Sequence, residues 1–220
     1  MSYQHRFSDD SPCALPAGKV VCVGRNYAAH AKELNNPLPD QPLLFLKPST
    51  ALADMTAPLR LPRQRGACHH ELEVALLIGQ PLCDASPKEC MAAVLGYGLA
   101  LDLTLRELQD ELKKKGQPWE RAKAFDGACP LSAFVPAQQV GDWRELRLTL
   151  QRNGARQQDG ACSDMLFPVD ELLAEISRSF TLLPGDVVLT GTPAGVGPLL
   201  SGDQLRCELG GLLTVSTSVL

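Results

Sequence analysis

The sequence lacks the features that mark membrane proteins and nucleic-acid-binding proteins. It has no apolar run of the roughly 18 or more residues that a membrane-spanning helix needs. It also has no excess of positive charge, since 21 Lys and Arg residues face 25 Asp and Glu residues. This balance argues against nucleic acid or an anionic membrane as a partner. Residues 1–18 resemble neither a signal peptide nor a transit peptide, so we expect a cytoplasmic location.

Closely spaced cysteines are missing as well. The chain has 8 cysteines, but no two of them are spaced as C-x-x-C. Zinc ribbons and zinc fingers need such pairs, so the sequence excludes them. Several cysteines, such as Cys22, lie within apolar segments. We therefore expect buried free thiols in a reducing compartment.

The sequence is rich in short strand-like segments. They contain many β-branched residues and end at Gly, Pro or Asp, and they cover residues 19–23, 43–47, 73–78, 97–101, 146–151, 186–190, 204–209 and 212–216. Helical patterns cover 27–35, 104–115 and 169–179, the second with a capping box at Thr104 and Glu107. Strands outnumber helices without βα alternation, which predicts a β-dominated α+β fold. We expect one catalytic domain over residues 19–220, preceded by an N-terminal extension over residues 1–18.

Carboxylates stand next to two apolar segments. Glu71 and Glu73 are two residues apart at the start of an apolar strand, so they share one face of it. Asp102 follows a second apolar run. Three carboxylates suit Mg²⁺ or Mn²⁺, whereas a solvated surface location for all three is the alternative. By strand parity His69 lies on the same face and His70 on the other, and we expect neighbouring or packing roles for them rather than metal ligation.

Three further patterns contain polar side chains that are candidates for catalysis or binding. His30 and Glu33 are three residues apart in a short helix, where a carboxylate can orient an imidazole as a general base. Arg106 and Gln109 have the same spacing just after Asp102, and Lys123 lies between apolar residues as a candidate oxyanion stabiliser. An exposed ion pair and a solvated helix face are the alternatives for the two helical pairs.

A Gly-rich loop follows the segment 186–190. It lacks the Gly-Lys-Ser/Thr of a phosphate-binding loop, so that interpretation fails. A tight loop that presents backbone N–H groups and Thr192 to a small carboxylate fits better.

The chain resembles the fumarylacetoacetate hydrolase family, in particular its small acylpyruvate hydrolase-like members. The resemblance covers residues 19–219 and depends on the joint order of Gly24-Arg25-Asn26-Tyr27, His69-His70-Glu71-x-Glu73, Asp102-x-Thr104-x-Arg106-x-x-Gln109, Lys123-x-Phe125-Asp126 and Thr190-Gly191-Thr192-Pro193-x-Gly195-Val196-Gly197.

The resemblance implies a role for each matching residue. Glu71, Glu73 and Asp102 match the Mg²⁺ or Mn²⁺ ligands. His30 and Glu33 match a water-activating dyad on a lid, and Lys123 matches the lysine that stabilises an oxyanion or enolate. Substrate-binding positions match Arg106, Gln109 and Thr192, with Arg25 and Lys47 expected near the same pocket. The family fold implies a roll of mixed β-sheet, usually as a homodimer.

The expected activity is hydrolysis of a carbon–carbon bond in 3-acylpyruvates such as acetylpyruvate, which gives pyruvate and a carboxylic acid through a metal-stabilised enolate. Because only 5% of the residues are aromatic, small aliphatic substrates are favoured over aromatic ones. The same site would serve decarboxylation or keto–enol tautomerisation of oxaloacetate, or the isomerases and decarboxylases of aromatic breakdown. A non-catalytic metal-binding scaffold is the remote alternative.

Overall fold

The computed structural model describes residues 3–9, 11–62 and 64–220. Its largest sheet is mixed, with β1 parallel to β12 and β3 parallel to β8, while the remaining pairs are antiparallel. In order across the sheet its strands are β2 (Leu43–Lys47), β1 (Val20–Gly24), β12 (Val187–Leu189), β5 (Leu72–Ile78), β6 (Val94–Leu101), β8 (Cys129–Leu131) and β3 (Leu52–Asp54), and β9 (Val135–Pro136) pairs with β6.

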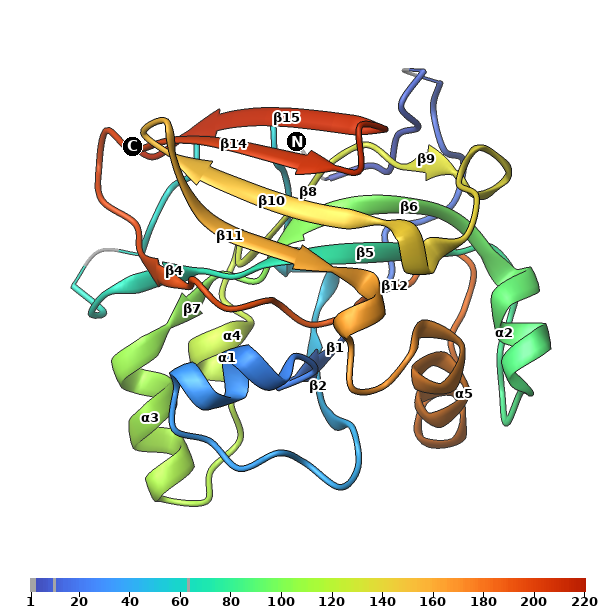
Figure 1. Ribbon diagram of the computed structural model, residues 1–220, viewed down its shortest axis with the longest axis horizontal. Helices are drawn as coiled ribbons and strands as arrows, with labels where there is room; N and C mark the ends of the chain where they lie inside the picture. The colour runs from blue at the N-terminus through green and yellow to red at the C-terminus, as the bar shows by residue number, and fades with distance from the viewer. Residues whose placement is uncertain (1–2, 10, 63) are drawn as a thin grey trace.

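Two smaller sheets are also formed by the described residues. An antiparallel sheet is formed by β11 (Ala155–Ala161), β10 (Arg147–Arg152), β14 (Gln204–Leu209) and β15 (Leu213–Ser218), and a small one by β13 (Gly197–Pro198), β4 (Cys68–His70) and β7 (Thr104–Leu105). The four-stranded sheet lies across β5 and β6 (Figure 1). Side chains of one face of β5, such as Val74 and Leu76, pack with Leu148 and Cys207 of that sheet in a common core.

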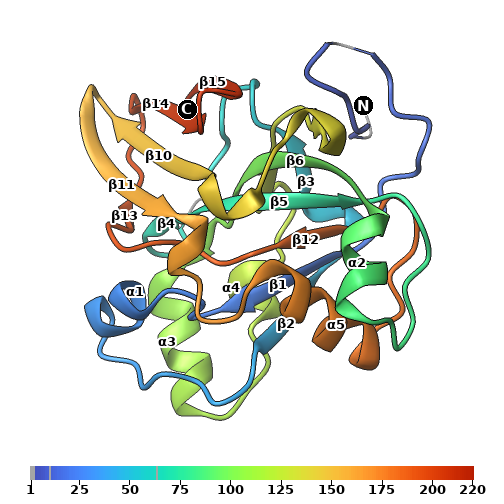
Figure 2. The same ribbon diagram turned by 45° about the vertical axis from the view of Figure 1, so that its right-hand side comes forward.

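The helices lie in two groups in Figures 1 and 2. One group contains α1 (Ala28–Glu33), α3 (Arg106–Lys114) and α4 (Glu120–Lys123), and the other contains α2 (Pro87–Ala93) and α5 (Val169–Ser179). Short 3₁₀ helices cover Ser49–Ala51, Ala137–Gln139, Trp143–Glu145 and Cys162–Asp164. Among the described residues no helix is long and apolar enough to cross a membrane.

The expected fold class is confirmed, with strands at all the expected segments and helices at the three helical patterns. The capping box at Thr104 is wrong, because Thr104 belongs to β7 and pairs with His69 of β4. Helix α3 therefore begins only at Arg106 and has no side-chain cap. The expectation of free thiols also holds for all 8 cysteines, although Cys83 is exposed.

Strand order explains why the polar residues meet. In the series β1, β12, β5, β6 the first two strands are parallel and the rest alternate in direction. The ends of β1, β12 and β6 and the start of β5 therefore lie at one edge of the sheet. Arg25, Thr192 and Asp102 follow three of these strands, and Glu71 precedes the fourth. Segments far apart in the sequence thus contribute side chains to one edge.

Candidate active site

A cleft at this edge is covered by α1, α3 and α4. It has an empty volume of about 390 Å³, including space open to solvent. Most of the sequence-predicted site residues line it: Arg25, His30, Glu71, Glu73, Asp102, Arg106, Gln109, Lys123 and Thr192. The rest of its wall includes Val23, Gly24, Leu34, Asn36, Phe45, Lys113 and Trp119.

Three buried carboxylates form the floor of the cleft. Ligand atoms of Glu71, Glu73 and Asp102 lie within 4.8 Å of one another. Glu73 belongs to β5 and is only 1% exposed, since its neighbours on the same face, Ala75 and Leu77, are core residues. Glu71 occupies the break between β4 and β5.

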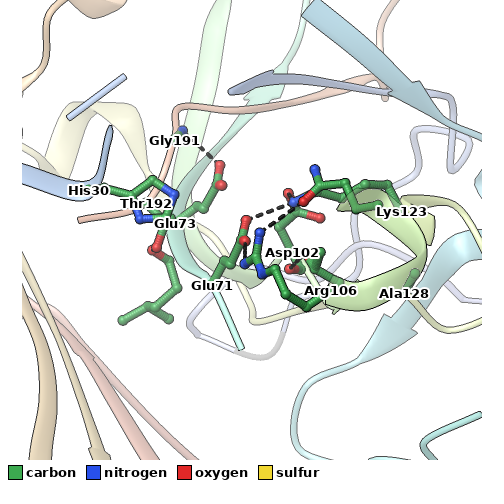
Figure 3. Close-up of polar contacts among 12 residues, drawn as sticks. His30, Glu71, Glu73, Asp102, Arg106, Lys123, Ala128, Gly191 and Thr192 are labelled. Carbon is green, nitrogen blue, oxygen red and sulfur yellow. Dashed lines mark hydrogen bonds and ion pairs between the residues drawn. The ribbon is translucent and has the colours of Figure 1, made fainter. Parts of the chain in front are cut away.

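Buried cations neutralise two of these acids (Figure 3). The Nζ of Lys123 lies 2.7 Å from Glu71 and 2.6 Å from Asp102. Arg106 pairs with Glu71 and also donates to Gln109 Oε1 at 2.8 Å. Within the described part of the chain Glu73 has no ion pair, and its Oε2 accepts a hydrogen bond from the Gly191 amide at 2.7 Å.

The pKa values follow from this unequal pairing. Burial alone would raise the pKa of Glu71, but Lys123 and Arg106 hold it well below its usual range. For Glu73, burial and then the charge of Asp102 raise the pKa well above its usual range. Burial opposes the charge on Lys123, yet Asp102 and Glu71 raise its pKa, so this ammonium stays protonated.

The chemistry of this donor set fits a hard divalent cation. Three carboxylates supply oxygen ligands only, as Mg²⁺ and Mn²⁺ prefer. A cation beside Glu73 would also compensate the buried charge whose cost is visible in its raised pKa. Neither His69 nor His70 belongs to the possible ligand group found among the described residues. The triad could therefore hold a metal ion through oxygen ligands alone.

His30 lies in the wall of the cleft, with Glu33 beside it. The Nδ1 of His30 is 3.3 Å from Glu33 Oε2, and His30 is buried. The other carboxylate oxygen of Glu33 accepts a hydrogen bond from the Gly195 amide at 3.0 Å. Burial lowers the pKa of His30 in spite of the opposing charge of Glu71. A neutral imidazole whose Nδ1 faces a carboxylate leaves Nε2 available as a base.

Glu33 and Lys47 are the predicted site residues that do not line the cleft; Glu33 contacts His30, whereas Lys47 lies elsewhere. Lys47 is completely buried behind Asp102, with Nζ 2.8 Å from Asp102 Oδ1. Its ammonium also donates to the carbonyl of Lys123 and, at 3.2 Å, to that of Ala128. These contacts hold Asp102 and the end of α4, so Lys47 is not positioned to reach a molecule in the cleft.

The sequence gave no signal for Gln158, although it supports the cleft. This buried residue of β11 donates from Nε2 to Thr192 Oγ1 at 2.7 Å. Its Oε1 accepts from the Leu72 amide at 2.9 Å and lies 3.0 Å from His70 Nδ1. A polar residue in a strand of a different sheet shows no spacing relation to the motifs it supports. The Gly-rich loop does present backbone amides, but those of Gly191 and Gly195 bind carboxylates of this chain.

Known proteins share this architecture over nearly the whole chain. The family model "Fumarylacetoacetate (FAA) hydrolase C-terminal" matches residues 19–220. The oxaloacetate tautomerase YcgM of Escherichia coli (strain K12) is 50% identical over 210 residues, which are 95% of this chain and 96% of that protein. The mitochondrial oxaloacetate tautomerase FAHD1 of Homo sapiens is 44% identical over 201 residues, 91% of this chain and 90% of that protein.

A solved structure agrees with these matches. The crystal structure of fumarylpyruvate hydrolase from Pseudomonas aeruginosa in complex with Mn²⁺ and pyruvate is similar with a TM-score of 0.93 and 36% identity, covering 100% of this chain and 96% of that one. On the family match over residues 19–220 and these identities, the chain belongs to the fumarylacetoacetate hydrolase family of enzymes.

Proposed function

We propose that this protein interconverts the keto and enol forms of oxaloacetate with the help of Mg²⁺ or Mn²⁺. The observation that carries the proposal is His30 in the wall of a cleft floored by three buried carboxylates, with the carboxylate of Glu33 beside its Nδ1. The 50% identity to an oxaloacetate tautomerase supports this choice of reaction. It favours tautomerisation over the acylpyruvate hydrolysis that the sequence motifs suggested first.

The proposed metal site consists of Glu71, Glu73 and Asp102. A divalent ion there would supply positive charge next to the oxygens of a 2-oxo acid and favour its enolate. Three cations of the chain, Lys47, Lys123 and Arg106, contact these acids and equal the three carboxylates in number. A divalent cation would then leave two positive charges for the substrate to balance, which suits a small dianionic acid.

The chain's own residues account for the proton transfer. In this proposal His30 Nε2 removes a proton from C3 of the keto form and delivers it to the oxygen at C2, which gives the enol, and the reverse transfer regenerates the keto form. Glu33 holds the ring in orientation through Nδ1. The charged Nζ of Lys123 stabilises the negative charge that develops on the oxygen at C2.

Hydrolysis of an acylpyruvate is the second candidate. It is favoured by the 36% identity to a fumarylpyruvate hydrolase that covers the whole chain. In that reaction His30 would deprotonate a water molecule instead of a carbon atom. Decarboxylation of oxaloacetate would use the same electron sink without a water activator.

The test offers enol-oxaloacetate, keto-oxaloacetate and acetylpyruvate in parallel to the purified protein with Mg²⁺. We expect fast interconversion of the first two, and loss of roughly a hundredfold or more in kcat for His30→Gln, since general bases contribute about 10²–10⁴-fold. Faster cleavage of acetylpyruvate would establish the hydrolase instead. Release of CO₂ at the rate of oxaloacetate loss would establish the decarboxylase.

We further propose that the protein is a homodimer, which the family resemblance supports, and that it is located in the cytoplasm. The human relative named above is a mitochondrial protein by its name. Light scattering after size-exclusion chromatography tests the dimer, and fractionation of source cells tests the location. A monomer, or recovery of the protein in an organelle fraction, would contradict these two proposals.

A further inference from the structure

Two cations at the mouth of the cleft have no part in holding the carboxylate triad. Arg25 follows the end of β1 and has a backbone φ of 61°, a left-handed conformation that non-glycine residues seldom adopt. Lys113 lies in the last turn of α3, with its ammonium 5.5 Å from the centre of the Trp119 ring. Both line the cleft together with Arg106.

The positive charges of these two residues are largely unused by the protein. Among the described residues Arg25 has no ion pair, and Lys113 approaches only the half-exposed Asp110, at 3.5 Å. Arg106, in contrast, is held by Glu71 and Gln109. Burial and the neighbouring charges of Arg106 and Arg25 lower the pKa of Lys113. Like charges gathered in a partly buried cleft repel one another, and an anion between them removes that cost.

We propose that Arg25 and Lys113 form a binding subsite for the second, distal carboxylate of a four-carbon 2-oxo dicarboxylate. The inference rests on the proposed function, in which the 2-oxo acid end of the substrate faces the triad and Lys123. The opposite end then points toward the mouth, where a guanidinium and an ammonium meet it. An Arg fork and a Lys point charge are the usual partners of such a carboxylate.

The subsite would set substrate choice by charge. Oxaloacetate carries a carboxylate at each end, whereas acetylpyruvate ends in a methyl ketone that offers these cations no charge. The pair would therefore favour the dicarboxylate over a monoanionic 2-oxo acid of similar size. A charge-assisted contact of this kind corresponds to a preference of about tenfold, or about 1.4 kcal/mol.

The experiment measures binding to the Mg²⁺-loaded protein by calorimetry, so it does not depend on turnover. The probes are L-malate, a stable dianion, and its 4-amide, which has the same shape with one charge less. We expect malate to bind about tenfold more tightly than the amide. The double variant Arg25→Gln with Lys113→Met should reduce this ratio to about 1 with little change in affinity for the amide. Methionine keeps the apolar contact with Trp119.

A matched control distinguishes a local subsite from the overall electrostatic potential of the protein surface. Lys114→Gln removes a neighbouring exposed charge that does not line the cleft, and it should leave the ratio unchanged. A ratio that persists in the double variant, or that falls equally in the control, would overturn the subsite. Absence of oxaloacetate turnover in a protein that keeps the malate preference would overturn the proposed function while the subsite stands.

Discussion

Lys47 shows what a single residue contributes when it is completely removed from solvent. Its ammonium contacts Asp102 Oδ1 and the carbonyls of Lys123 and Ala128, so its donors are all engaged. The motifs led to a family resemblance that placed Lys47 near the pocket. They could not tell on which side of Asp102 it lies, because a strand residue points to one face or the other according to pairing that the local sequence does not encode.

Replacement of Lys47 by Met should weaken metal binding without removing any proposed ligand. Asp102 would lose one of its two buried cations, and the end of α4 would lose its tether. We expect a loss of about 3 kcal/mol in the free energy of unfolding and a Mn²⁺ affinity lower by roughly tenfold. Electron paramagnetic resonance of free Mn²⁺ gives the affinity, and urea unfolding gives the stability.

A variant that is destabilised elsewhere provides the control for Lys47. Leu148→Ala shortens a buried side chain of β10 in the core between the sheets and should cost about 2–5 kcal/mol with Mn²⁺ affinity unchanged. Equal affinities in folded Lys47→Met and in the wild type would show that Lys47 does not position Asp102.

At the scale of elements, Glu33 connects helix α1 to the loop after β12. One carboxylate oxygen faces His30 and the other accepts the Gly195 amide hydrogen. The same loop supplies the Gly191 amide that binds Glu73. The position of the proposed base is thus coupled to the loop that holds a proposed metal ligand.

Gly195→Ala should disturb this connection. Gly195 has a φ of +98°, and an added Cβ would lie 1.8 Å from the carbonyl oxygen of Gln157 in β11, so the loop must shift. We expect kcat to fall at least tenfold, because the amide that holds Glu33 moves with the loop. Steady-state kinetics on oxaloacetate at saturating Mg²⁺ measure the change.

Gly202→Ala is the matched control for this prediction. Gly202 has a similar φ of +92°, but nothing lies within 4 Å of its added Cβ. This variant should cost about 1 kcal/mol of stability from backbone strain and leave kcat unchanged. Similar losses of kcat in both variants would show that strain, and not the contact with Glu33, is responsible.

Element prediction was accurate for some segments, both short and long, but it missed the 7-residue strand β11, and one local signal was misleading. The segments 43–47, 169–179 and 204–209 agree with β2, α5 and β14 residue for residue. The pattern S/T-x-x-E occurs both at Thr104 and at Ser86, yet only Ser86 and Glu89 form a capping box, at the start of α2. Thr104 pairs with a strand instead, so tertiary contacts decide which of two equal local signals forms a helix.

At the scale of the molecule, the strand order could not be predicted from spacing alone. It brings Arg25, Glu71, Asp102 and Thr192 to one sheet edge through non-local pairing. The acids, the dyad and Lys123 were identifiable because several motifs with known order occurred together. Gln158, Lys113 and the roles of the Gly191 and Gly195 amides depend on contacts between distant segments, which no local pattern contains.

The N-terminal segment should make the stability of the whole molecule depend on pH. His5 is fully buried against the turn at Gly185, with Nε2 2.9 Å from its carbonyl, and burial lowers the His5 pKa from 6.5. Above pH 6.5 the ring is neutral in both states. As the pH falls below 6.5 only the unfolded chain takes up this proton, so the stability from a neutral His5 is progressively lost.

This pH dependence is measured by urea unfolding of the wild type and of His5→Gln at pH 7.5, 6.5 and 5.5. These values extend roughly one unit to either side of the ordinary pKa of histidine. Below pH 6.5 the free energy of unfolding should fall more steeply with pH in the wild type than in the variant. The difference in slope should be at most about 1.4 kcal/mol per pH unit. Parallel curves would contradict a buried neutral His5. The other histidines and Glu73 contribute equally to the pH dependence of stability in both proteins, so their contributions cancel in the comparison.

Exchange of the C3 hydrogens of oxaloacetate with solvent deuterium tests the central claim most directly. We would follow it by NMR with the Mg²⁺-loaded protein, with His30→Gln and with Mg²⁺ alone. The account predicts that the wild type accelerates exchange far above Mg²⁺ alone without a matching release of pyruvate, and that His30→Gln loses most of this acceleration. Exchange no faster than with Mg²⁺ alone, or equal exchange in His30→Gln, would contradict the account.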